Sequence, residues 1–261
     1  MKIGINWTST RDLASVRELI HHGAIDFVEI MIDNFLSCSA ASIMSVLDGT
    51  ACAFHIMNSR FLHQDPEVLM TIACKINELS SVLNPIYTSD HLGKFLHRGH
   101  YFPQMLEVNY ATDLAFCSEK LSHWQAILGS TIFIENYPSI IAQPYKQAEF
   151  FVQLKRSTSC NLLFDISNAT IAEINIGEDA LAWRTLSTDT KHFHIAGFAK
   201  TSFLPHFFVD THDCDIDPRS IWLAEKILNN REEITVCVER DSNFEVENWM
   251  NEISRVRNLI S

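Results

Sequence analysis

Short apolar runs recur along the chain, and each is followed by a longer stretch of amphipathic or polar sequence. Near-continuous apolar runs of this length are typical of parallel strands that are buried on both faces. The pattern predicts eight such strands, at Ile3–Trp7, Phe27–Met31, Cys52–Ile56, Ile86–Ser89, Thr131–Ile134, Asn161–Phe164, His192–Ala196 and Ile234–Val238.

The stretches between these runs carry helix signals. Asp65-Pro66-Glu67 combines an N-cap acid, a proline at the first helical position and an acid in the first turn. Asn84-Pro85 ends the same helix. Helices are predicted over Leu13–His21, Glu67–Leu83, Asn109–Leu128, Lys146–Lys155, Asp179–Leu186, Asp217–Asn229 and Glu245–Ile260.

Strands that alternate with helices predict an α/β fold, here one (β/α)8 TIM barrel domain over residues 1–261. A doubly wound open sheet is the alternative, but no GxGxxG motif follows the first strand and the chain has only 8 glycines. Two connections are longer than the rest, His91–Glu107 and Phe198–Cys214. In a barrel both would lie over the carboxyl-terminal mouth, where active sites are built.

Composition and charge exclude several classes of protein. The 261 residues include 20 Lys+Arg and 32 Asp+Glu, and the formal net charge of −12 disfavours a general binder of nucleic acid or anionic membranes. The 7 cysteines lack CxxC spacing and suggest reduced thiols. No secretory signal and no apolar run of about 18 residues occur, so we expect a cytoplasmic protein without a membrane span.

Histidine and acidic residues follow almost every predicted strand. Barrel geometry gathers the strand ends in one ring, and so many carboxylates would repel one another there without counter-ions. Imidazole and carboxylate are ligands of iron, manganese and zinc, and this many ligands imply two or three ions, with Glu135 as a candidate bridge. The predicted metal ligands are His55, His91, Glu135, Asp165, Asn168, His192, His194, Asp210, His212 and Glu239.

Each of these residues also has an ordinary structural interpretation. A lone histidine at a strand end is more often a hydrogen-bonded structural group, and Asp165 or Glu239 alone could cap the next helix. Their joint occurrence at the strand ends favours the metal cluster. No GxSxG, P-loop, HExxH or EF-hand pattern offers a competing site.

The strand-end segments resemble the multinuclear non-haem iron-dependent oxidase family, and most closely its methanobactin biosynthesis branch of MbnB type. Many members have a glycine-rich segment after the third strand and a histidine at the position of Phe198, and this chain has neither, in agreement with that branch. The resembling segments run in order along nearly the whole chain, at Ile3–Asn6, Phe27–Ile30, Ile32–Phe35, Phe54–Met57, Ser89–His91, Glu135–Ser139, Phe164–Asp165, Ser167–Ala169, His192–Gly197, Asp210–Asp213 and Glu239–Asp241.

The resemblance implies a xylose-isomerase-like barrel that holds two or three iron ions in mixed Fe(II)/Fe(III) valence, on the same ten ligands. It implies that the substrate is a cysteine in a ribosomally made precursor peptide. That cysteine would be converted to an oxazolone with an adjacent thioamide, with O2 as the co-substrate. A small MbnC-like partner protein would form a heterodimer with the chain and help to recruit the peptide.

Three further residues are candidates beside the ligands. Asp241 follows Glu239 and is the candidate catalytic base, while Asp90 and Asn136 are expected to hold ligands in place. Two other functions stay open. One is a metal-dependent hydrolase or sugar isomerase of the xylose-isomerase or endonuclease IV type, and the other is a non-catalytic peptide-binding subunit.

Overall fold

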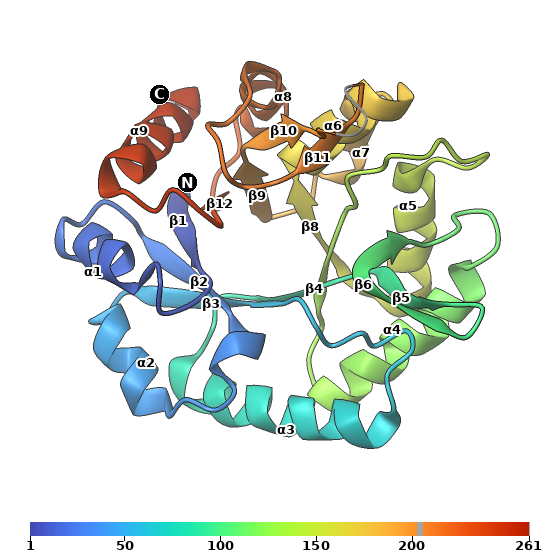
Figure 1. Ribbon diagram of the computed structural model, residues 1–261, viewed down its shortest axis with the longest axis horizontal. Coiled ribbons are helices and arrows are strands. Elements are labelled where there is room, and N and C mark those ends of the chain that lie inside the picture. Colours follow the sequence, from blue (N-terminus) through green and yellow to red (C-terminus); the bar gives the residue numbers. More distant parts are fainter. Residues whose placement is uncertain (203–205, 261) are drawn as a thin grey trace.

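The computed structural model describes residues 1–202 and 206–260. Within them, eight parallel strands form a closed barrel in the order β1-β12-β9-β8-β7-β4-β3-β2 (Figure 1). This confirms the predicted (β/α)8 barrel and excludes the open sheet. The barrel strands are β1 Lys2–Trp7, β2 Phe27–Met31, β3 Ala51–Ile56, β4 Thr88–His91, β7 Phe133–Glu135, β8 Asn161–Asp165, β9 His192–Ala196 and β12 Thr235–Glu239.

Helices surround the barrel, and α9 packs beside α1, so that the ring of helices closes (Figure 1). The α-helices are α1 Leu13–His21, α2 Ala40–Leu47, α3 Pro66–Leu83, α4 Leu114–Leu128, α5 Gln147–Thr158, α6 Ile166–Ile176, α7 Trp183–Leu186, α8 Pro218–Leu228 and α9 Val246–Arg257. Short 3-10 turns cover Ile32–Phe35, Ala180–Ala182 and Asn258–Ile260. None of the described helices combines the length and apolar character needed to cross a membrane.

Two helices, α2 and α6, were not predicted from the sequence. Ser39 caps α2 by accepting a hydrogen bond from the backbone of Ser42. Asp165, the last residue of β8, caps α6 by accepting one from the backbone of Asn168 at 2.7 Å. Strand β8 therefore passes directly into α6, and the cap places Asn168 one turn above the strand end.

The two long connections each contain a small antiparallel sheet. Strands β5 Gly93–His97 and β6 His100–Glu107 pair in the first, and β10 Phe198–Lys200 and β11 Phe208–Asp210 pair in the second, whose residues 203–205 lie outside the described part of the chain. Both sheets contribute residues to a pocket that also contains His91 of β4 and Asn168 of α6. They therefore stand at the carboxyl-terminal mouth, as predicted.

An apolar layer closes the lower part of the barrel interior. The inward side chains there include Phe27, Tyr87, Leu163 and Cys237, all buried. Gly4 makes room for this layer, because a Cβ atom at Gly4 would lie 2.6 Å from the Phe27 ring. The next residues along each strand that face inward are polar, so a dry floor lies beneath a polar layer.

Candidate metal centre

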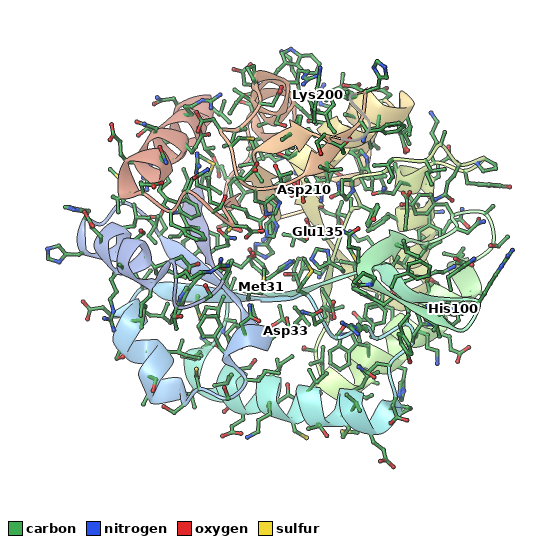
Figure 2. The ribbon with its side chains drawn as sticks, viewed as in Figure 1. Met31, Asp33, His100, Glu135, Lys200 and Asp210 are labelled. Atoms are coloured by element: carbon green, nitrogen blue, oxygen red, sulfur yellow. The ribbon has the colours of Figure 1, made fainter. Side chains whose placement is uncertain are left out.

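The polar layer is built by the carboxyl ends of six barrel strands. The parallel register pairs His91 with Glu135, and Asp165 with His194. Figure 2 shows Glu135 and Asp210 near the middle of the barrel, whereas His100 and Lys200 lie toward its periphery. The six inward side chains at these strand ends are His55, His91, Glu135, Asp165, His194 and Glu239.

One group in this layer consists of His55, His91 and Glu135, whose ligand atoms lie within 4.8 Å of one another. The Nε2 atoms of the two histidines are 2.8 Å apart, and Glu135 Oε2 lies 3.6 Å from His55 Nε2. The Ser89 hydroxyl donates its hydrogen to the Phe54 carbonyl, so it accepts one from His55 Nδ1 at 2.8 Å. The lone pair of His55 Nε2 therefore points into the group.

A second group consists of Glu135, Asp165, His194 and Glu239, again with ligand atoms within 4.8 Å of one another. His194 Nδ1 lies 3.0 Å from Glu239 Oε2 and 3.7 Å from Glu135 Oε1. Glu135 belongs to both groups and offers a different oxygen to each. It has the position of a bridging carboxylate between two ions, the role that the sequence suggested for it.

Three more predicted ligands lie beside these groups. His212 Nε2 is 2.8 Å from Asp210 Oδ1 and 4.0 Å from Glu239 Oε2. Asn168 donates from Nδ2 to Glu135 Oε1 at 3.1 Å, and its own Oδ1 has no hydrogen-bond partner within residues 1–202 and 206–260. The structure therefore brings nine of the ten predicted ligands into one cluster.

His192 does not join the cluster, contrary to the sequence-based prediction. It lies two residues before His194 on the same face of β9, which places it about 7 Å deeper in the barrel. Its ring stacks on Tyr87 with 4.2 Å between centroids, and Nδ1 lies 2.8 Å from the Thr235 hydroxyl. Burial lowers the pKa of His192 to about 4. His192 is thus a packing residue of the barrel floor.

Asp90 and Asn136 hold the backbone of ligand-bearing strands and do not touch a histidine ring. Asp90 accepts from the backbone N–H of His91 at 2.7 Å and from Trp124 Nε1 at 2.9 Å. Asn136 accepts from the backbone N–H of Asp165 at 2.7 Å and donates to its carbonyl at 2.9 Å. Both residues fix the position of the neighbouring ligand through the main chain.

Glu29 was missing from the predicted site. Its carboxylate is 1% exposed, accepts a hydrogen bond from the Tyr87 hydroxyl and lies 2.9 Å from His194 Nε2. The signal in the sequence is an acidic residue in the middle of the apolar run Phe27–Met31, where burial without a partner would be costly.

The cluster contains buried polar atoms that form no hydrogen bond of normal geometry within the described residues, although some of them lie close to a group of opposite charge. Each such atom costs about 1–3 kcal/mol if it stays unpaired. Bound cations would satisfy all of them, and a set of nitrogen and carboxylate donors suits iron, manganese or zinc. The unpartnered atoms are Glu135 Oε2, Asp165 Oδ2, Asn168 Oδ1, His194 Nδ1, Asp210 Oδ1, His212 Nε2 and Glu239 Oε2.

Burial and crowding shift the pKa values in the cluster. Burial raises the pKa of Glu135, Asp165 and Glu239 to about 7 each, and the nearby Asp210 carboxylate adds to the shift at Asp165. Burial lowers the pKa of His91 to about 3. His194 is equally buried, but the carboxylates of Glu239 and Glu29 raise its pKa well above 6.5. Without a cation, the carboxylates therefore share protons with the histidines near neutral pH.

These shifts predict how metal binding depends on pH. Carboxyl groups with a raised pKa stabilise the fold below pH 4, and this contribution is lost as the pH rises through about 7. His91 has a lowered pKa and gives no further change above pH 6.5. The metal-free protein should therefore lose stability between pH 6.5 and 8. Metal affinity should rise with pH up to about 7, by as much as tenfold per pH unit for each proton displaced, and level off toward pH 8.

Thermal unfolding at pH 6.5, 7.25 and 8, with and without Zn(II), would measure both effects. We expect the rise in melting temperature caused by the metal to grow with pH. A rise of the same size at all three pH values would contradict the assignment of the raised pKa values to the metal-binding carboxylates.

The barrel and the cluster at its mouth place the chain in the class of xylose-isomerase-like TIM barrels with a candidate metal centre. The fold is similar to endonuclease IV from Thermus thermophilus, with a TM-score of 0.64 and 12% identity over 99% of this chain and 98% of that chain. It is also similar to D-allulose 3-epimerase from Methylomonas sp., with a TM-score of 0.60 and 12% identity over 97% of this chain and 89% of that chain. Identities this low show the fold alone.

The sequence itself identifies the family. Residues 2–261 match the family model of the RiPP precursor modification enzymes MbnB/TglH/ChrH, and the chain belongs to this family. RiPPs are ribosomally made peptides that are modified after translation. The chain is also 26% identical to a UPF0276 protein of Acaryochloris marina over 87% of this chain and 83% of that protein. The family places this chain among enzymes that act on precursor peptides.

Proposed function

We propose that the chain is an O2-dependent iron oxidase that converts a cysteine of a precursor peptide to an oxazolone with an adjacent thioamide, as in methanobactin biosynthesis. The observation that carries the proposal is the pair of ligand groups joined by Glu135. A bridged site for two cations suits a reaction in which O2 and the substrate thiol must meet. The family supports a peptide as the substrate.

The described side chains divide naturally between two or three iron ions of mixed valence. His55, His91 and Glu135 would hold one ion, and Glu135 with Asp165, His194 and Glu239 would hold the second. Asn168, Asp210 and His212 would complete a third position. When bound, the iron would supply the reduction of O2 and coordination of the substrate thiolate.

A pocket of about 450 Å³ gives access to the cluster from the mouth. His91, Asn168 and Asp210 stand at its inner end, and the apolar side chains of Phe95 and Met105 line its walls. A cysteine side chain entering here would pass the apolar walls, which β5 and β6 supply, and would reach the ligand residues at the inner end. The pocket thus orients a thiol toward the proposed ions.

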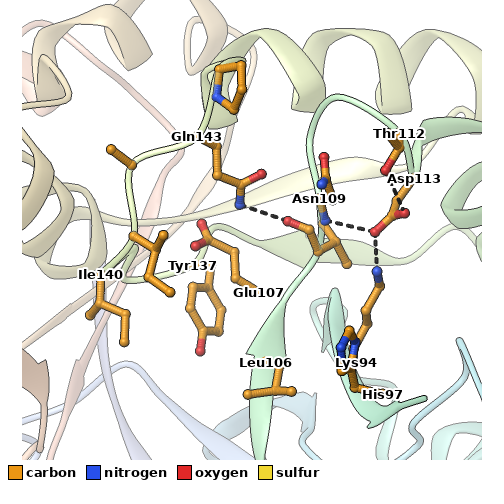
Figure 3. A pocket seen from close by; sticks show the side chains of 14 residues that line it. Lys94, His97, Leu106, Glu107, Asn109, Thr112, Asp113, Tyr137, Ile140 and Gln143 are labelled. Atoms are coloured by element: carbon orange, nitrogen blue, oxygen red, sulfur yellow. Dashed lines mark hydrogen bonds and ion pairs between the residues drawn. The ribbon is translucent and has the colours of Figure 1, made fainter. Parts of the chain in front are cut away.

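A larger pocket of about 630 Å³ continues from the first, because Tyr137 and Ile140 line both (Figure 3). Figure 3 shows Ile140 and Tyr137 on one side of it and the Lys94–Asp113 ion pair on the other. Ile141, on its rim, is 68% exposed. We assign this groove to the residues of the peptide beside the reacting cysteine, with backbone and apolar contacts supplying affinity.

Asp241 is the base that we propose for removing a substrate proton. Its carboxylate is 47% exposed, and Oδ2 lies 3.2 Å from His212 Nδ1. It is therefore next to a proposed ligand and still open to the mouth. We further propose that the enzyme works in the cytoplasm as a heterodimer with a small MbnC-like partner that delivers the peptide.

The decisive experiment combines the Fe(II)-loaded protein with a cysteine-containing precursor peptide and a small partner protein, both to be sought in the reading frames beside its gene. We expect O2 uptake together with a loss of four hydrogens from the peptide in its mass spectrum. A colourless zinc protein that consumes no O2 would instead support a hydrolase or isomerase. An iron-loaded protein that binds peptide and consumes no O2 would support a non-catalytic subunit.

A further inference from the structure

We infer that Glu29, supported by Tyr87, is a positioning residue that fixes the His194 ring so that Nδ1, not Nε2, faces the metal cluster. The inference rests on the proposed metal function and adds a residue from β2, a strand that supplies no predicted ligand. Glu29 reaches His194 across the barrel interior, since β2 and β9 are separated by β1 and β12 in the closed sheet.

The hydrogen bonds around Glu29 determine which ring nitrogen of His194 carries a proton. Glu29 Oε2 lies 2.9 Å from His194 Nε2 and also accepts from the Tyr87 hydroxyl. A carboxylate can only accept, so Nε2 must be the N–H of His194. The lone pair of the neutral ring is then on Nδ1. Nδ1 lies 3.0 Å from Glu239 Oε2 within the second ligand group, so a bound cation would take the place of any proton on Nδ1.

The other inward histidines show why such a partner is needed. His55 is held from below by Ser89 at Nδ1 and presents Nε2 to the cluster. His212 is held by Asp241 at Nδ1 and presents Nε2 to Asp210. His194 has the reverse orientation, because its holding group lies beneath it on the opposite wall of the barrel. A metal-bound histidine whose second nitrogen is fixed keeps both its tautomer and its ring angle.

Glu29 and His194, together with Cys237, also lie close enough to hold an ion of their own. Glu29 Oε2 is shared by two donors, His194 Nε2 and the Tyr87 hydroxyl, whereas Glu29 Oε1 is buried and has no hydrogen-bond partner among the described residues. The Cys237 thiol is fully buried in the apolar floor, where it packs with Phe27 and Tyr87. The number of ions bound distinguishes the two roles. Loss of a ligand removes an ion at saturation, whereas loss of a positioning residue only weakens the binding of an ion.

Anaerobic titration with Fe(II), and in parallel with Zn(II), tests this inference through protein-bound metal. Glu29→Gln should raise the half-saturating concentration for one ion by roughly 10–100-fold and leave the number of ions at saturation unchanged. Tyr87→Phe removes only the hydroxyl and should weaken the same ion by a smaller factor, about 2–10-fold. Glu252→Gln is the matched control, because Glu252 is also buried but pairs with Arg255 away from the cluster.

Isotherms of Glu29→Gln that match the wild type would overturn the inference, and so would the loss of one whole ion at saturation, which would make Glu29 a ligand. If Glu29→Gln fails to fold by circular dichroism, Tyr87→Phe decides: wild-type affinity there would also overturn it. A wild-type protein that binds Zn(II) but no Fe(II) would refute the iron oxidase, while the Zn(II) isotherms still report on Glu29.

Discussion

Glu135→Gln should abolish metal binding at two positions at once and, in the metal-free protein at pH 8, raise the melting temperature. Glu135 is the residue common to both ligand groups, so its loss removes a ligand from each ion. The affinity for each ion should fall by more than the roughly 100-fold that follows the loss of a residue hydrogen-bonded to a metal ligand. O2 consumption, if the proposed function holds, should disappear with the metal.

The gain in stability has a separate physical cause. Burial raises the pKa of Glu135 to about 7, so ionising it at pH 8 costs the metal-free fold roughly 3 kcal/mol. Glutamine has no charge, and its oxygen can still accept from Asn168 Nδ2. The melting temperature should therefore rise by about 5 °C or more. Such a trade-off, in which a functional residue destabilises the fold, is typical of active sites.

Metal analysis and thermal unfolding of the stripped protein would measure both effects, with Glu252→Gln as the control. Burial raises the pKa of Glu252 as well, but Glu252 has no contact with the cluster. A Glu135→Gln protein that keeps two ions would show that Glu135 does not bridge them. A metal-free Glu135→Gln protein that is less stable than the metal-free wild type would contradict this. It would show that the hydrogen bonds of the Glu135 carboxylate stabilise the fold by more than the burial of its charge destabilises it.

The barrel could be predicted because its strands are buried on both faces. Such strands have near-continuous apolar sequences, which can be recognised without a structure. Strands β2 and β9 have the predicted bounds. Strand β4 does not, because Ile86 stays at the surface and the strand continues to His91. The shift matters for the site, since it makes His91 the last residue of the strand and not part of a loop.

Elements without an amphipathic period could not be predicted. Helix α6 runs from β8 through Ile166, Asn168 and Ile171, and nearly all of its first two turns are buried. A helix buried on every side has no polar face, and therefore no periodic signal. The sheets β5–β6 and β10–β11 were anticipated only as long connections, because their pairing depends on contacts within the mouth.

The candidate site shows the same limit at the level of single residues. Strand alternation predicts that both His192 and His194 face inward, because residues two apart share a face. The two residues differ in height along the barrel axis, and the stagger between neighbouring strands decides which of them is level with the ligands of the other strands. Glu29 sits at a height where it meets His194 from across the barrel. Only the closed structure relates these two residues, which are 165 positions apart.

The position of Asp241 permits two roles that a single substitution can separate. Asp241 Oδ2 lies 3.2 Å from His212 Nδ1, as expected of a group that orients a ligand. Asp241 Oδ1 accepts from Asn6 Nδ2 at 3.1 Å, which anchors the carboxylate to β1. The side chain is nevertheless 47% exposed at the mouth, as a base that meets substrate must be. Loss of a catalytic base lowers the rate of turnover and leaves the metal in place. Loss of a group that orients a ligand lowers the affinity for the metal first.

Asp241→Asn should therefore slow peptide oxidation by about 10²–10⁴-fold while the iron content stays near that of the wild type. Asparagine keeps the size of the side chain and one acceptor oxygen, but it cannot take up a proton at neutral pH. Turnover and bound iron should be measured on the same preparation, with Asp213→Asn as the control, because Asp213 is an exposed acid directly after His212, in the loop between β11 and α8. Loss of iron in parallel with activity would assign Asp241 to the support of His212. Normal turnover with normal iron would remove it from the chemistry and leave the proton to a group of the peptide or its partner.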